Sequence, residues 1–194
     1  FGYNNGVRIN GLTIDHGTVE TVGGAHLWLT PVTMTAGVIT STGGAYQWGG
    51  VALKTLASPD TATISGVVDL RPDHGDLTFE VENGVAEADL LVSASMVNNA
   101  TWGNANLVKT GPGTMVVTAA NDNKGNVTVS GGTFRIATGA SLFHGGYNNT
   151  AVLTVNNGGT LELDRWGYGT GGDNMSLGGL DYNPARFVLD GGTV

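Results

Sequence analysis

Apolar and polar residues alternate in short runs along most of the chain. In Val127-Thr-Val129 and Phe134-Arg-Ile136, apolar side chains stand two residues apart, with threonine or arginine between them. This period of two is typical of β-strands, whose successive side chains point to opposite faces. Between the runs, Gly-Gly and Asn-Gly pairs supply the positive φ that tight turns require. The pattern therefore predicts short strands that are joined by glycine-rich turns.

One phrase returns several times: a short alternating run, a turn with glycine, and a second run that opens with threonine or valine. Successive turn glycines are 20 to 33 residues apart, except for one interval of 66 residues that has room for degenerate copies. A β-solenoid explains this period better than a sandwich, which places a turn about every 8–12 residues. A glycine-rich antiparallel barrel stays open as an alternative, because its strands alternate in the same way. The turn glycines are Gly17, Gly37, Gly66, Gly132, Gly159 and Gly192.

Composition narrows the class of protein. The 194 residues include 33 glycines, 24 threonines and 17 asparagines, so most polar groups are uncharged. Because the sequence has no cysteine, disulfide frameworks and thiolate metal sites are excluded. A net charge of −8 disfavours nucleic acid and anionic lipid as partners. No apolar run reaches the length of about 18 residues that a transmembrane helix needs.

One segment fits two kinds of secondary structure. Residues 85–95 keep a helical spacing of apolar side chains, whereas the run from Asp89 to Ala94 alternates as a strand. We expect a strand, because Asn83-Gly84 marks a turn before this run and strands are predicted on both sides of it.

The most specific motif is the stretch from Leu107 to Thr118, LVKTGPGTMVVT. It resembles the autotransporter-associated β-strand repeat, also called the passenger-associated transport repeat, whose pattern is Lys-Thr-Gly-x-Gly-Thr followed by alternating apolar residues. A glycine-bearing turn and a second apolar-Gly-Thr phrase extend the match over residues 107–136, although Asn123-Lys124 replaces the usual aromatic of the middle turn. Residues 61–106 resemble the degenerate rungs that usually precede the motif. The motif residues are Lys109, Thr110, Gly111, Gly113, Thr114, Gly125, Gly132 and Thr133.

The resemblance implies a right-handed parallel β-helix, or β-solenoid, from a large and repetitive bacterial protein that is secreted or anchored at the surface. We expect residues 1–194 to form one all-β segment of a longer repetitive protein, because the sequence starts without methionine and stops within the repeat pattern. About eight rungs at about 4.8 Å each give a length of about 40 Å. Outward threonine and asparagine should form hydrogen bonds along the stack. The expected interior contains Leu12, Ile14, Val32, Met34, Val127, Val129, Leu153, Val155, Leu161, Leu163 and Phe187.

In families with this repeat, the repeat is structural and has no shared catalytic residues. The sequence adds no Gly-x-Ser-x-Gly elbow, no phosphate-binding loop and no histidine pair at helical spacing. We therefore expect a non-catalytic structural or adhesive segment of an extracellular or cell-surface protein, such as an adhesin or a fibre, without cofactor or metal. The expected partners are copies or flanking repeats of the same protein along the solenoid axis. Surface glycans are a further alternative.

The densest polar segment runs from Asp69 to Asp76 and is followed by Glu80 and Glu82. Such carboxylates could bind Ca²⁺ or, as an acid–base pair on a β-helix face, cleave a polysaccharide. We favour a solvated loop, because an active site on a solenoid needs a second acidic cluster at the matching position of another phrase. Glu80 and Glu82 alternate with apolar residues and are expected to face solvent together.

Two other segments have a functional interpretation beside a structural one. Residues 169–181 half-match a calcium-binding nonapeptide, but such sites need tandem copies, so a glycine-rich turn is preferred. Aromatic residues beside glycine and asparagine could stack on sugars, or they could fold back over the rung ends and close the core. An ice-binding face is disfavoured, because Thr33 and Thr35 have no matching pair in the next phrase. The candidate ligand contacts are Trp48, Trp166, Tyr168 and Tyr182.

Overall fold

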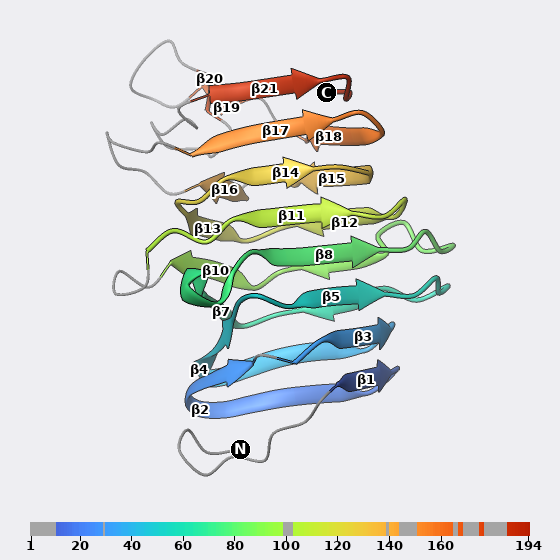
Figure 1. Ribbon diagram of the computed structural model, residues 1–194. Coiled ribbons are helices and arrows are strands. Elements are labelled where there is room, and N and C mark those ends of the chain that lie inside the picture. Colours follow the sequence, from blue (N-terminus) through green and yellow to red (C-terminus); the bar gives the residue numbers. More distant parts are fainter. Residues whose placement is uncertain are drawn as a thin grey trace.

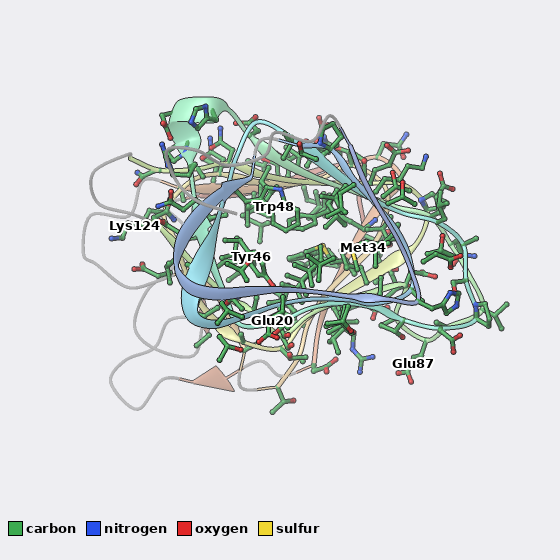
Figure 2. All side chains as sticks on the ribbon, turned by 90° about the horizontal axis from the view of Figure 1, so that it is seen from below. Glu20, Met34, Tyr46, Trp48, Glu87 and Lys124 are labelled. Carbon is green, nitrogen blue, oxygen red and sulfur yellow. The ribbon has the colours of Figure 1, made fainter. Side chains whose placement is uncertain are left out.

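The computed structural model is a coil of parallel β-strands that rises from the N-terminal to the C-terminal end (Figure 1). The front strands run to the right and the back strands to the left as the polypeptide rises, and the view along the axis agrees (Figure 2), so the coil is right-handed. The expected right-handed parallel β-helix is confirmed. The structure describes residues 11–28, 30–98, 103–138, 140–143, 151–164, 167–168, 175–176 and 186–194.

The first sheet has eight strands, and each strand pairs in parallel with the next one up the coil. One strand of this sheet, with the strands of the second sheet that follow it, makes one rung, so the expectation of about eight rungs holds. The strands, in order, are β1 (Leu12–Asp15), β3 (Val32–Thr35), β5 (Ala52–Thr55), β8 (Leu77–Val81), β11 (Leu107–Thr110), β14 (Val127–Val129), β17 (Val152–Asn156) and β21 (Arg186–Asp190).

The second sheet has eleven strands and divides above β4 into two branches. It starts with the long strands β2 (Thr18–Trp28) and β4 (Val38–Trp48). One branch continues through β6 (Ala62–Ile64), β9 (Leu90–Val92), β12 (Thr114–Val117), β15 (Gly132–Ile136) and β18 (Gly159–Leu163). The other branch continues through β7 (Val67–Leu70), β10 (Ser95–Asn98), β13 (Ala120–Asn123) and β16 (Ser141–Phe143).

The division of the second sheet follows from where glycine bends the backbone. In β4, Gly43 has a φ of +70°, which turns the strand, and the register with β2 is the same before and after this residue. In the next rung, Gly66 has a φ of +84° and separates β6 from β7. Because β4 pairs with β6 at Val38 and with β7 at Tyr46, one bent strand supports both branches. The coil above β4 is therefore three-sided.

Two short elements lie outside these sheets. Strands β19 (Gly167–Tyr168) and β20 (Met175–Ser176) form a two-stranded antiparallel pair, and η1 (Pro72–His74) is a single 3₁₀ turn before β8. In the described part of the protein, no helix is long and apolar enough to cross a membrane. All pairings in the two large sheets are parallel, so the alternative of an antiparallel barrel is wrong.

The interior is filled by alternate residues of most strands of the two large sheets, as the period of two predicts. Of the eleven predicted interior residues, eight are buried, and Leu12 and Leu163 are partly buried against the core. The side chain of Phe187 lies outside the described residues. The ambiguous segment 85–95 contains β9 and the start of β10, which confirms the strand prediction.

Polar side chains form hydrogen bonds from rung to rung, as expected for outward asparagine and threonine. Asn106 Nδ2 donates to Asp76 Oδ1 at 3.0 Å, and Asn106 Oδ1 accepts the Asn126 amide at 2.9 Å. Asn126 Oδ1 then accepts the Val152 amide at 2.9 Å. Four successive rungs are thereby linked at the N-terminal ends of the strands of the first sheet.

Candidate functional site

The motif of residues 107–136 occupies two stacked rungs. Strand β11 pairs with β14 and β12 pairs with β15, so the two halves of the motif lie directly over each other. The Lys-Thr-Gly-Pro-Gly-Thr segment is the corner between β11 and β12, and Gly132-Thr133 begins the corresponding strand of the next rung. The motif therefore encodes one corner of the solenoid and the corner that covers it.

Lys109 lies on the inward face of the first sheet, in a column that is otherwise apolar. Its side chain is 2 % exposed. A cation at this position would lose its hydration, so it needs other hydrogen-bond partners. The column, as defined by strand register, contains Val32, Leu53, Phe79, Lys109, Val129 and Val155.

The Lys109 ammonium finds its partners at the corner. Nζ donates to the carbonyl oxygens of Thr110 and Gly111, each at 2.9 Å, and of Gly131 at 2.8 Å. The first two carbonyls belong to its own rung and the third to the rung above. Burial lowers the pKa of Lys109 to about 8, and the negative charge of Asp89 opposes this change. Lys109 is a buried clamp that holds two corners together.

The corner glycines are required by close backbone approach. Gly111 has a φ of +78°, and a Cβ at this position would lie 2.4 Å from the Val81 carbonyl oxygen of the rung below. At Gly125, a Cβ would lie 1.9 Å from the Ala105 carbonyl oxygen. Any larger residue at either position would force the rungs apart. Gly113 and Gly132 have similar contacts with the carbonyl oxygens of Glu82 and Gly113, respectively.

The threonines of the Gly-Thr phrases stack in one column. Thr114 pairs with Thr133, Thr133 with Thr160, and Thr160 with Thr193. Asp89 lies beneath Thr114, is 5 % exposed, and its Oδ2 accepts the Thr114 amide at 2.7 Å. Asp89 Oδ1 accepts the Gly84 amide at 2.6 Å. The Gly-Thr phrases that recur in the sequence therefore form a column of stacked threonines, and the Asp89 carboxylate lies at the lower end of this column.

Comparison with protein-family models agrees with this geometry. The model of the passenger-associated transport repeat matches residues 107–136. No curated protein and no solved structure matched the sequence. The repeat associates the protein with autotransporter passengers, the class that the sequence motif already resembled.

Outside the repeat, the acidic segment from Asp69 to Asp76 does not form a carboxylate site. Arg71 donates to both carboxylate oxygens of Asp73, from Nε at 2.9 Å and from Nη2 at 2.8 Å. This guanidinium lowers the pKa of Asp73. Asp69 Oδ2 instead accepts Gln47 Nε2 at 3.0 Å. A general acid needs a raised pKa, so Asp73 is not suited to that role.

Glu80 and Glu82 are also engaged with a cation. Lys54 Nζ lies 2.6 Å from Glu80 Oε1 and 3.1 Å from Glu82 Oε1. The two carboxylates raise the pKa of Lys54, and all three side chains are partly exposed on the outer side of the first sheet. Because η1 and the end of β8 lie at opposite ends of that strand, the structure does not bring Asp73 and these two glutamates together.

The predicted aromatic contacts have different outcomes. Trp48 is 1 % exposed and packs in the core with Tyr46, with 6.4 Å between ring centroids. The prediction of Trp48 as a ligand contact is therefore corrected: its position agrees with the alternative that loop aromatics close the core. Trp166 and Tyr182 lie outside the described residues, and only the backbone of Tyr168 is described, in β19.

A shallow depression of about 350 Å³ lies on the outer side of the branch that contains β9 and β12. Leu91 and Val116 line it, and Arg135 borders it. Arg135 Nε donates to Asp164 Oδ1 at 2.7 Å and Nη1 to Glu87 Oε1 at 3.3 Å, so this cation is already paired across the rungs. Within the described residues, no group of three or more His, Asp or Glu side chains could hold a metal ion. Most of the half-matched calcium segment, 169–181, lies outside these residues.

The sequence patterns do not reveal three buried polar residues that hold the corners. These residues are Asp89, Asn121 and Asn123. For Asp89, the sequence patterns predict only that it lies in a strand, although the Asn83-Gly84 turn before it indicates a corner. Asn121 Oδ1 accepts the Met96 amide at 2.7 Å, and its Nδ2 donates to the Ser141 carbonyl at 2.8 Å. Asn123, which replaces the aromatic of the repeat, is fully buried and its amide bonds both the N–H and the carbonyl of Gly125.

Proposed function

We propose that this protein is a structural segment of a secreted or surface-exposed bacterial protein, in which the solenoid acts as a non-catalytic rod. The observation that supports the proposal is what the buried charged residues at the repeat corner contact. The buried ammonium of Lys109 and the carboxylate of Asp89 are both directed at backbone groups of neighbouring corners. Charged groups committed in this way stabilise the rod and are not available for chemistry on a substrate.

The outer side of the first sheet supports a role in contact between copies. On β5 and β8 this side presents Lys54, Glu80 and Glu82, whereas on β11, β14 and β17 it presents no charge. An uncharged flat β-surface can approach another surface without the cost of desolvating ions. The residues of this uncharged face are Val108, Thr110, Thr128, Ser130, Val152, Thr154 and Asn156.

We therefore propose self-association as the mode of action, with copies or flanking repeats as partners. The backbone ladder is the same at every rung, so a further rung of the same design would continue it along the axis. The uncharged face adds a lateral contact. Reach, adhesion or coat formation would follow from such contacts in an extracellular setting.

Sedimentation of the purified protein over a range of concentrations tests the proposal. We expect concentration-dependent association, and we expect the double variant Thr128→Lys, Thr154→Lys to weaken it, because like charges would then face each other. The matched control, Thr13→Lys, places a lysine outside the uncharged face and should leave lateral association unchanged. A wild-type protein that stays monomeric at high concentration contradicts the proposal. Binding on a glycan array or turnover of a polysaccharide would instead favour the carbohydrate alternatives.

A further inference from the structure

Two Asn-Gly pairs lie in the described part of the protein and differ in their surroundings. One is Asn83-Gly84, in the corner after β8, and the other is Asn157-Gly158, in the turn between β17 and β18. In an Asn-Gly pair, the glycine nitrogen can attack Cγ of the asparagine, because glycine offers no Cβ to hinder the approach. The sequence makes the two pairs equivalent, and only their structural settings distinguish them.

In the first pair, Asn83 is exposed but the glycine is held in place. The Gly84 N–H donates to Asp89 Oδ1 at 2.6 Å, and Asp89 is buried. A Cβ on Gly84 would lie 2.2 Å from the Ser58 carbonyl oxygen and 2.7 Å from the Ser58 nitrogen, so this backbone is pressed against the rung below. Attack requires the Gly84 nitrogen to lose its proton and to rotate toward Asn83. A carboxylate acceptor and a packed neighbour oppose both steps.

The second pair is open. Asn157 and Gly158 are both exposed, and a Cβ on Gly158 would meet no atom within 4 Å. Gly158 has a φ of +84°, in a turn that is set by two residues between strands. Such an exposed turn can reach the attack geometry through local motion, without unfolding of the adjoining strands.

We propose that Asn157 is a site of spontaneous deamidation and isoaspartate formation, while Asn83 is protected by the fold. The Gly158 nitrogen gives up its proton to solvent base and forms a bond with Asn157 Cγ. Nδ2 of Asn157 takes up a proton from the protonated solvent base, its bond to Cγ breaks and ammonia leaves, which completes the succinimide. Water opens the succinimide at either carbonyl and gives aspartate or isoaspartate. Each event replaces a neutral amide by a carboxylate.

The modified turn supports the last described rung. Strand β17 pairs with β21, where Asn156 lies opposite Asp190, and a Cβ on Gly191 would lie 3.3 Å from Asn157 Cβ. Isoaspartate adds one carbon to the backbone of this turn and places a negative charge near Asp190. We expect the pairing of β17 with β21 to loosen, so this rung should become less stable as the modification accumulates with time.

The test is incubation of the intact protein in mildly alkaline buffer, followed by peptide mapping with fragmentation that distinguishes isoaspartate from aspartate. A parallel sample is incubated in denaturant, and a zero-time digest corrects for modification during proteolysis. In the folded protein, we expect Asn157 to be converted at least about tenfold faster than Asn83. In the denatured protein, the two rates should become similar.

Two outcomes would overturn the proposal. One is a folded protein in which Asn157 persists as long as Asn83, and the other is a rate ratio that denaturant leaves unchanged. The variant Asn157→Ser provides the assignment control, because it removes the reactive amide from an exposed position and leaves Asn83 in its native corner. In this variant, the isoaspartate signal of the folded protein should disappear from the peptide that contains position 157.

Discussion

Two kinds of corner occur on the same backbone ladder: the bend within β2 and β4, in residues 12–48, and the corner between β11 and β12, in the repeat of residues 107–136. In the lower rungs, β2 and β4 are single 11-residue strands that bend at Gly23 and Gly43. Around these glycines the structure leaves open space, since a Cβ on either would meet no atom within 4 Å. In the repeat rungs, the corner at Gly111 is closely packed and is held by the buried Lys109.

The difference shows how a solenoid can combine a uniform backbone ladder with corners that differ in how much a substitution destabilises them. An open glycine bend depends only on backbone conformation, so a substitution there has a local cost. A closed corner also depends on the rung below and the rung above, because its polar groups have been removed from water and must be paired. The repeat corner should therefore be the more fragile of the two, and four changes test this.

The largest effect is expected for Gly111→Ala. Alanine would have to adopt a φ of +78° and its Cβ would overlap the Val81 carbonyl oxygen at 2.4 Å. We expect a loss of about 3–4 kcal/mol in the free energy of unfolding, measured by chemical denaturation. The control, Gly43→Ala, has a similar φ of +70° but open space, and should lose only about 1–2 kcal/mol. Equal losses at the two positions would contradict the distinction between open and closed corners.

Lys109→Met comes next. Methionine can fill much of the volume of the buried lysine stem, but it cannot donate to the carbonyls of Thr110, Gly111 and Gly131. We expect the free energy of unfolding to fall by about 2–3 kcal/mol, because buried acceptors lose a donor and Asp89 loses a neighbouring positive charge. An unchanged denaturation midpoint would show that the clamp does not hold the corner.

The two regions should also differ in their response to pH. Lys109 has a pKa of about 8 in the folded protein and 10.5 as its ordinary value, so between these values the unfolded protein holds a proton that the folded protein has lost. Stability should therefore rise with pH in this window, by at most about 1.4 kcal/mol per unit. In the lower rungs, burial raises the pKa of Tyr46 above 10.0, which has the opposite effect at higher pH.

Denaturation of the wild-type protein and of Lys109→Met between pH 8 and pH 10 separates these contributions. The lower limit is the pKa of Lys109 in the folded protein, and the upper limit is the ordinary pKa of tyrosine. The difference in stability between the two proteins should widen as pH rises, because only the wild type has the lysine. A constant difference over this range would mean that Lys109 keeps its proton throughout. Tyr46→Phe serves as the control, and its slope in this window should match that of the wild type.

The smallest effect is expected for Lys54→Met, on the outward side of the same sheet. Lys54 is about one-third exposed and pairs with Glu80 and Glu82. Solvent screens these pairs, so the loss should be much smaller than that of Lys109→Met and should shrink as salt is added. A loss as large as that of Lys109→Met would show that burial is not what makes the repeat lysine important.

The candidate site can be predicted from the sequence only in part. The motif from Lys109 to Thr133 is recognisable because its residue types and spacing form a specific pattern, and the family-model match covers the same residues. The structural task of Lys109 cannot be foreseen, because its partner carbonyl at Gly131 lies 22 positions away and meets it only through stacking. The sequence is misleading at Trp48 for a similar reason: its neighbours in the sequence are loop-like, whereas its ring is enclosed by other rungs.

The sequence by itself determined the class of fold and the interior. Alternation with a period of two decided which side chains face inward, and the glycine-threonine phrases decided how often the backbone returns to the same side. Tertiary structure alone decided where the coil changes from bent strands to separate branches, and which polar groups are buried at the corners. The physical reason is distance along the sequence. Alternation is a property of neighbouring residues, whereas the burial of Lys109, Asp89 and Asn123 results from rungs that lie about one full turn away in sequence.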